Sequence, residues 1–278
     1  MKKRTNIVLA ILSGLLLLDL GQAQTIVMQP GQKGPIETFL ERALERPKPP
    51  RMSGSMVRVG SSQEIVRRLR KQSEADAELR ARYRDFLRQS GTGIFKFVVP
   101  RDCDSLNTMR EITDCGSEKA EIEFQFAEYS FRDKKLSYLN PDILYRNGTI
   151  SPASVFVQAA FVKLEDGAVQ EVTLGSEGLD YLISLNIESV AAKADEQLFR
   201  HSFGVEEGDF RYVRSIRPEK GDVYAARLVS YDIDGRDAMS PKPADLIVAF
   251  EIIEQEPDGT LTILWKELRR QRSPRLTL

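Results

Sequence analysis

The clearest pattern along the chain is an alternation of apolar and polar residues near its C-terminal end. Two apolar runs, 244–255 and 261–268, are separated by the turn sequence Pro257-Asp258-Gly259. Proline fixes φ in such a turn and glycine supplies a positive φ, while alternate residues of a strand point to the same face of a sheet. The pattern therefore predicts a β-hairpin whose inward face carries Leu246, Val248, Phe250, Ile252, Leu261, Ile263 and Trp265.

The same arrangement of two runs around a turn occurs earlier in the chain. Residues 155–164 and 168–174 flank Glu165-Asp166-Gly167, which predicts a second hairpin. Residues 136–154 contain two prolines and Asn147-Gly148, and we expect them to form a long irregular connection. Further strand candidates lie at 94–99, 121–131 (with Ile122, Phe124 and Phe126 inward), 179–185 and 223–233.

Together these runs predict a mainly β fold, an antiparallel β-sandwich-like domain over residues 91–278. The length is sufficient for one large core or two small ones. The domain is therefore expected either as one unit or as two sub-modules, 91–187 and 200–278.

Two stretches have the 3.6-residue period of a helix instead. Ser61-Ser62-Gln63-Glu64 is a capping-box sequence, and the stretch that it opens runs to about residue 90, before Gly91. This predicts one long, charged, amphipathic helix over 61–90. A second, shorter helix is predicted near 188–199, where apolar residues recur on one side.

The N-terminus has the pattern of a secretory signal. Lys2, Lys3 and Arg4 precede an apolar run at 7–18, and the small residues Gly21 and Ala23 follow it. A helix of the apolar run would be about 18 Å long, too short for a hydrocarbon core of about 30 Å. We therefore expect residues 1–23 to be removed, and the protein to be periplasmic or secreted without a transmembrane segment.

Residues 24–60 are rich in proline and glycine and are expected to be an extended tether. Within it, an apolar face recurs at helical spacing and predicts a short amphipathic helix before Pro47. Such a helix either docks on its own domain or binds a partner. The face consists of Ile36, Phe39, Leu40, Ala43 and Leu44.

The net charge and the two cysteines bear on the kind of partner and on whether the chain has a disulfide. Removing three positive charges and Asp19 with the signal changes the formal net charge from −1 to −3, and this nearly neutral balance gives no support to nucleic acid as a partner. Cys103 and Cys115 are the two cysteines. In an exported chain without a C-x-x-C motif, they predict one structural disulfide.

Candidate catalytic chemistry is scarce. His201 is the single histidine, and neither G-x-S-x-G nor S-x-x-K is present, which excludes the familiar serine hydrolase motifs and zinc sites with several His or Cys ligands. Acidic clusters near Asp104, Glu206 and Asp234 lie in turn-rich segments, where Asp is a common turn residue. The sequence therefore predicts no catalytic residue, no cofactor-binding residue and no metal ligand.

One short stretch resembles a known module. Residues 221–235, in which Tyr224 opens a strand and Asp232, Asp234 and Gly235 close it, resemble the late strands of a fibronectin-III or immunoglobulin-like domain. The resemblance implies a sandwich in which Tyr224 makes a tyrosine-corner hydrogen bond. It implies no activity.

These features favour an exported, non-catalytic protein that binds a macromolecular partner, a protein of the cell envelope or extracellular space, through its N-terminal third. The candidate anchors are the apolar residues Phe39 and Leu40 in the tether and Tyr83 and Phe86 in the long helix. Two alternatives remain open. One is a carboxylate-dependent hydrolase of an envelope or extracellular polymer, and the other is a lipocalin-like carrier of a small ligand.

Overall fold

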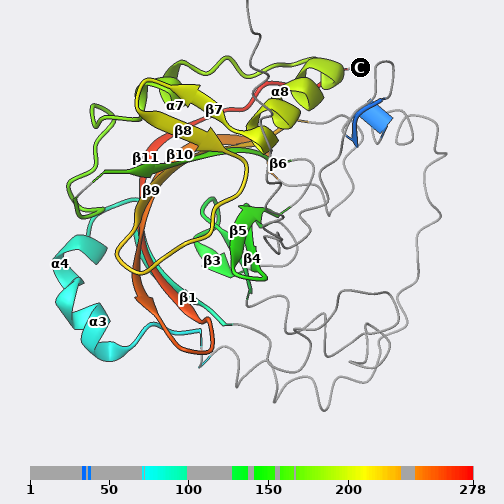
Figure 1. Ribbon diagram of the computed structural model, residues 1–278. Coiled ribbons are helices and arrows are strands. Elements are labelled where there is room, and N and C mark those ends of the chain that lie inside the picture. The colour runs from blue at the N-terminus through cyan, green and yellow to red at the C-terminus, as the bar shows by residue number, and fades with distance from the viewer. Residues whose placement is uncertain are drawn as a thin grey trace, which may run out of the picture.

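The fold consists of two antiparallel sheets and a few short helices (Figure 1). The computed structural model describes residues 33–35, 37–38, 71, 73–98, 127–136, 141–153, 157–165, 167–232 and 242–277. The large sheet has seven strands, in the order β1 (Thr92–Phe97), β11 (Leu261–Gln271), β10 (Ala244–Gln255), β9 (Val223–Ser230), β6 (Val157–Leu164), β8 (Phe210–Val213) and β7 (Val205–Glu207). The small sheet has the order β3 (Lys135–Leu136), β2 (Glu128–Ser130), β4 (Ile143–Arg146) and β5 (Thr149–Pro152). The predicted mainly β, antiparallel class is confirmed.

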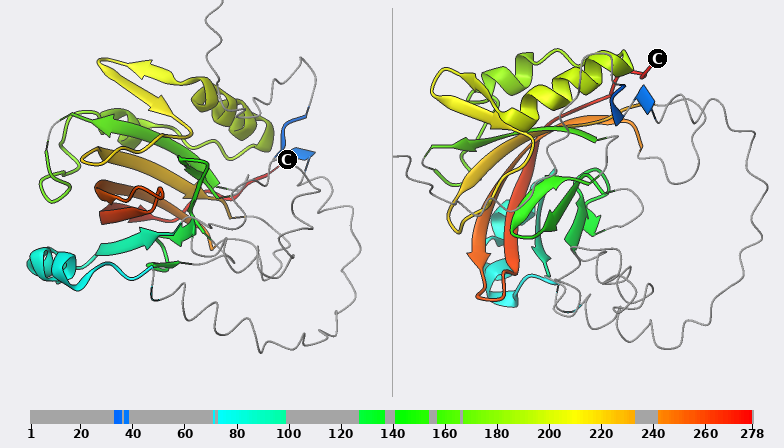
Figure 2. Two further views of the ribbon diagram at one scale, coloured as in Figure 1. Left: turned by 60° about the horizontal axis from the view of Figure 1, so that its bottom comes forward. Right: turned by 45° about the vertical axis from the view of Figure 1, so that its right-hand side comes forward.

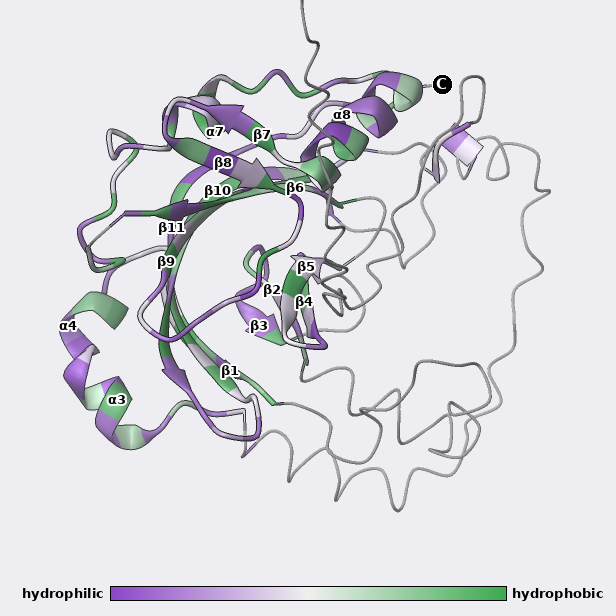
Figure 3. Ribbon diagram, in the orientation of Figure 1, coloured by the Kyte–Doolittle hydropathy of each residue, from purple (hydrophilic) through white to green (hydrophobic). Residues whose placement is uncertain are grey.

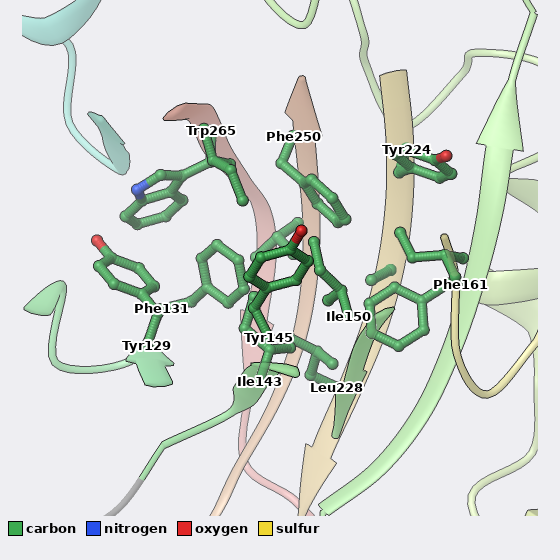
Figure 4. Close-up of a cluster of buried hydrophobic side chains, with 14 of the residues drawn as sticks. Tyr129, Phe131, Ile143, Tyr145, Ile150, Phe161, Tyr224, Leu228, Phe250 and Trp265 are labelled. Carbon is green, nitrogen blue, oxygen red and sulfur yellow. The ribbon is translucent and has the colours of Figure 1, made fainter. Parts of the chain in front are cut away.

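The large sheet is curved, and the small sheet lies in its hollow (Figures 1 and 2). The space between them is filled by a buried cluster of apolar side chains that includes many aromatic rings (Figure 4). Strands from both predicted sub-modules alternate in the large sheet, because β1 and β6 come from the first and β7 to β11 from the second. The concave-face cluster includes Phe95, Phe97, Tyr129, Phe131, Tyr145, Phe161, Tyr224, Phe250 and Trp265.

The C-terminal hairpin, β10 and β11, is confirmed, together with its predicted inward face. All seven alternating residues of that face are buried in the concave-face cluster. The Trp265 ring lies 5.0 Å from that of Phe131 and faces Gly93 on β1. A Cβ atom at Gly93 would be 2.5 Å from Trp265 Nε1, so this position requires a glycine. The Trp265 ring on β11 therefore occupies the space left by the absence of a side chain at Gly93 on the neighbouring strand β1.

The convex face of the large sheet is covered by helices. Phe86 from α4 (Arg84–Leu87) and Leu182 from α7 (Asp180–Ser184) join side chains of β6, β9, β10 and β11 in a second buried cluster. Helix α8 (Ala191–Phe203) packs through Ala191, Ala194 and Leu198 against Val229 and Leu276. With both faces covered, all eight residues of β9 are buried.

A buried ion pair links the strands to α7. Arg227 on β9 donates from Nε and Nη2 to the carboxylate of Asp245 on β10, at 2.9 and 2.6 Å. Its Nη1 donates to the carbonyls of Leu182 and Leu185 at 2.9 and 2.5 Å. These carbonyls belong to the C-terminal turn of α7, which has no helical donors for them. One guanidinium therefore satisfies a carboxylate and a helix end together.

The long helix predicted over 61–90 is not supported. Residues 73–90 contain two short helices, α3 (Ala77–Arg82) and α4, instead of one continuous helix. Residues 73–76 are non-helical. This stretch contains Ser73 and Asp76, whose side chains can hydrogen-bond to nearby backbone groups and so compete with helix formation. Tyr83, with φ −98° and ψ 14°, separates α3 from α4.

Two further predictions are wrong because short apolar runs were interpreted as strands. Residues 168–174 form turns, and β6 pairs with β9 and β8 instead of making the second hairpin. Val169 and Val172 are both buried at a spacing of three, which is not the spacing of a strand face. Residues 179–185 contain α7, and Leu179 at its N-cap and Leu182 within it are both buried at a spacing of three.

The segment 136–154, expected to be irregular, contains the β4–β5 hairpin. Asn147 and Gly148 both have positive φ, 51° and 70°, as a two-residue hairpin turn requires. Pro152 is tolerated because β5 is an edge strand of the small sheet. The predicted strands at 94–99 and 223–233 are present as β1 and β9, and the helix near 188–199 is α8, which continues to Phe203.

Several predictions concern residues outside the described part of the chain. These are the signal sequence 1–23, most of the tether, the inward residues 122, 124 and 126, and the proposed Cys103–Cys115 disulfide. Among the described residues, none of the helices has the length and apolar character needed to span a bilayer.

Trp265 gives a direct test of the concave-face packing. Because its side chain is fully buried, Trp265→Ala should lower the free energy of unfolding by about 3 to 5 kcal/mol, measured by urea denaturation. Trp265→Phe keeps most of the ring and should cost less. As the chain has a single tryptophan, native emission should be that of a buried indole and shift to the red on unfolding. A native spectrum already at the exposed position would refute the packing.

Candidate functional site

The most exposed large apolar side chain of the described residues lies at the end of α8. Phe203 is 49% exposed, and the other large apolar side chain classed as exposed is Leu174, at 38%. The ring of Phe199, one helical turn earlier, lies 4.7 Å from that of Phe203 in an edge-to-face arrangement. We call Phe199 and Phe203 the α8 aromatic pair.

The position of the pair follows from how α8 begins and ends. At its start, the Ala191 N–H donates to the carbonyl of Thr277 at 2.8 Å, so the C-terminal tail satisfies a backbone donor of the first turn. At its end, Gly204 has φ 90°, which a glycine adopts readily. Arg211 on β8 donates to the Phe203 carbonyl at 3.0 Å, and a cation is favourable at a helix C-terminus.

The inner face of α8 at the pair is fixed by an aromatic and histidine cluster. His201 is 1% exposed, and its Nε2 hydrogen-bonds with the Tyr181 hydroxyl at 3.0 Å. The Tyr181 and Tyr212 rings are 4.2 Å apart, and the Tyr212 hydroxyl donates to the Gly178 carbonyl at 2.8 Å. Because this cluster holds the inner face of the helix, the α8 aromatic pair is directed outward.

Burial also sets the charge state of the cluster. It lowers the pKa of His201 to about 4, and the neighbouring Arg200 acts in the same direction. Burial, with nearby acidic groups, raises the pKa of Tyr212 to about 12. At neutral pH both side chains are therefore uncharged, as expected of groups that support a helix in a low-dielectric environment.

The pair lies beside an edge of the large sheet. Gly204 connects α8 directly to β7, the last strand in the sheet order. β7 forms a hairpin with β8. The acidic cluster predicted near Glu206 is on this hairpin, where Glu206, Glu207 and Asp209 are exposed and Glu206 pairs with Arg211 at 3.4 Å. The clusters at 104 and 234 lie outside the described residues, and Asp232 pairs with Arg272 at 3.1 Å. Within the described ranges, no three His, Cys, Asp or Glu side chains are grouped as a metal site requires.

The candidate anchors from the sequence have different surroundings. Phe86 is buried in the convex-face cluster, and Tyr83 is half-buried against it. While α4 stays on the sheet, Phe86 contributes to the core of its own domain. Phe39 and Leu40 lie outside the described residues. Phe203 was not among the predicted anchors, because the predicted helix ended at residue 199. The sequence signal for it was the i, i+4 spacing of Phe199 and Phe203, which places them on one face of a helix.

Tyr224, singled out by the module resemblance, hydrogen-bonds near the start of its strand. Its hydroxyl lies 3.3 Å from the Arg217 carbonyl and 2.6 Å from Asp222 Oδ2. The Asp222 carboxylate also pairs with Lys163 at 2.6 Å. These contacts hold the segment before β9 against the end of β6, and the module resemblance itself stays a prediction.

Comparisons with known proteins add no relative. No protein-family model, no curated protein and no solved structure matches the chain. Inferences about function therefore come from the chain's own surface and interior.

The His201 environment predicts a pH dependence of stability. In the unfolded chain this imidazole titrates near 6.5, while in the folded state its pKa is about 4. As pH falls from about 6.5 to 4, the unfolded state takes up the proton first, so stability is lost, by up to about 3 kcal/mol.

The measurement is urea denaturation of the wild type and His201→Asn at pH 7 and pH 4.5. The wild type should lose more stability on acidification than the variant. Glu128, whose pKa burial raises to about 7, contributes with the opposite sign in both chains and cancels in the comparison. An equal loss in the two proteins would show that His201 is not buried in its neutral form.

Proposed function

We propose that the chain is an exported, non-catalytic protein that binds a protein partner through the α8 aromatic pair, with the two-sheet domain as its rigid base. The observation that carries the proposal is the 49% exposure of Phe203 on a helix whose inner face is fixed. Export rests on the signal pattern of residues 1–23.

The composition around the pair supports recognition of a protein. Aromatic residues and Arg are enriched in the centres of protein interfaces. Arg200 on α8 and Arg211 on β8 are exposed beside the two phenylalanines. A side-chain pair held at 4.7 Å by packing loses little conformational freedom when a partner covers it. The arrangement therefore provides apolar anchors with cationic neighbours.

The adjacent sheet edge adds a second element. β7 is the terminal strand of the described large sheet and has only β8 as its neighbour there. An edge strand presents unpaired backbone groups, to which an extended segment of another protein can bind. The edge is short and carries Glu206 and Glu207, which favours a brief contact next to the aromatic anchors over a long added strand.

The interior supports a non-catalytic role. Four of the buried charged groups in the described core form ion pairs within the fold, Arg227 with Asp245 and Arg132 with Asp142. His201 is buried, uncharged and bonded to Tyr181. These groups support elements of the structure, so they are not free to act on a substrate.

The two alternatives have less support. A lipocalin-like carrier needs a closed barrel with a cavity, whereas the described large sheet has β1 and β7 as separate edges and its concave face is filled with apolar side chains. A carboxylate hydrolase needs two carboxylates at a defined separation in a cleft. The described acidic cluster at Glu206 lies on an exposed hairpin.

Site-specific photo-crosslinking tests the proposal. A photoreactive phenylalanine analogue is placed at position 203 in cells that make and export the protein. The control is the same analogue at Glu78, an exposed position on α3, a helix distant from α8 in Figure 1. We expect one discrete crosslinked protein from position 203 and none from position 78.

Additional substitutions check that the crosslink reports specific binding. Phe199→Ser should reduce the yield at position 203 at least tenfold without changing the thermal midpoint by more than a few degrees, since Phe199 is only partly buried. If position 203 gives no discrete product, or the same products as position 78, the α8 aromatic pair is not a partner surface.

A further inference from the structure

One desolvated positive charge of the fold has no counter-charge within the described part of the chain. Arg214 directly follows β8, and burial alone lowers the pKa of its guanidinium, with no acidic group acting on it. Its Nε is buried and has no hydrogen-bond partner. Such a charge is costly, because it gives up hydration without receiving a partner in return.

Other desolvated arginines show how the fold usually compensates this cost. Arg227 donates from Nε and Nη2 to the carboxylate of Asp245. Arg269, whose pKa burial also lowers, has the same carboxylate within electrostatic range, which raises its pKa in part. Arg214 differs from both, since no described carboxylate acts on it.

The backbone of Arg214 is held in place on both sides. Its N–H donates to the carbonyl of His201, in the last turn of α8, at 2.8 Å. Two residues later, Ile216 exchanges a pair of backbone hydrogen bonds, both of 2.9 Å, with Ile150 on β5. The start of the Arg214 side chain is therefore fixed between the large sheet, α8 and the small sheet, so a ligand would find it already positioned.

Capping of α8 does not account for Arg214. A cation is favourable at a helix C-terminus, but Arg211 has that role, because it donates to the Phe203 carbonyl at 3.0 Å and pairs with Glu206 at 3.4 Å. Among the described carbonyls, none accepts a hydrogen bond from the Arg214 side chain.

The two terminal nitrogens of this guanidinium can be reached from outside. Nε is the Arg214 nitrogen that is both buried and without a partner. Nη1 and Nη2 also make no hydrogen bond within the described ranges, yet they are not buried. Their N–H groups form one edge of the planar guanidinium and point in nearly parallel directions.

We propose that Arg214 is the recognition group of an oxyanion site beside the end of α8, where two oxygens of a phosphate or carboxylate group accept hydrogen bonds from Nη1 and Nη2. A guanidinium binds both groups through two parallel N–H···O bonds, and partial removal from water strengthens them. The site does not depend on the α8 aromatic pair being a partner surface.

Anion-dependent stability tests the site on the full chain. Thermal midpoints are measured in Tris chloride, and with inorganic phosphate or acetate added at constant ionic strength. At ten times the dissociation constant, one bound anion should raise the midpoint by about 3 to 6 °C. Arg214→Met should abolish the rise. The matched control is Arg217→Met, an exposed arginine three positions later, which should keep it.

Nuclear magnetic resonance locates the anion. The Nε–H signal of Arg214, assigned by its loss in Arg214→Met, should shift with increasing phosphate or acetate until it saturates. Arg214→Lys keeps the charge but not the planar pair of donors, so half-saturation of the stability increase should need about tenfold more anion.

Each outcome decides for or against the site. A saturable response to either anion supports it, and the stronger response identifies the ligand group as a phosphate or a carboxylate. An Nε–H signal that shifts with neither anion, or an equal rise of the midpoint in Arg214→Met, refutes it. In chloride alone, Arg214→Met should melt no lower than the wild type, because it removes a charge without a partner. A variant that melts far lower or does not fold would assign Arg214 a structural role instead.

Discussion

The structure depends on covering both faces of one large curved sheet. A sheet is stable in water only when its apolar faces are packed against other elements, and here the central strand β9 is buried along its whole length. The small sheet supplies the cover on the concave face and the helices supply it on the convex face. Helix α8 is therefore committed on its inner side, and only its outer side is free to meet another molecule.

Charge inside this sheet has a structural role. The ion pair of Arg227 and Asp245 joins neighbouring strands diagonally, because Arg227 is opposite Ile247 and Asp245 is opposite Val229. Gln271 on β11 donates to the same carboxylate at 2.7 Å. Burying two charges is costly unless every group is paired, and this network pairs them while tying α7 to three strands. Figure 3 shows hydrophobic stretches along these strands.

Alternation was a reliable guide where a strand has one side facing the concave cluster. It predicted seven inward residues of β10 and β11, including Trp265, and all seven are buried in that cluster. It failed for the short apolar runs at 168–174 and 179–185, because four or five apolar residues fit a turn or a helix as well as a strand. The order of the strands could not be predicted either, since β6 pairs with β9 across a long separation in sequence.

The candidate site was only partly accessible from the sequence. The spacing of Phe199 and Phe203 indicates a shared helix face, but their exposure depends on the buried contacts of His201 and Tyr181 beneath them. The hydrogen bond from Glu37 to Asp195 joins residues 158 positions apart, and neither residue has a local pattern that signals the other.

Hydrogen exchange of β9 tests the two-sided cover most directly. If both faces of the large sheet are packed, the amides of Val223–Ser230 should exchange only through global unfolding, with a free energy equal to that from denaturant unfolding. The amides of Gly208 and Asp209, in the exposed β7–β8 turn, serve as the internal reference and should exchange orders of magnitude faster. Exchange of β9 at the rate of that turn would contradict the account, because it would leave α8 without the rigid base on which its outward surface depends.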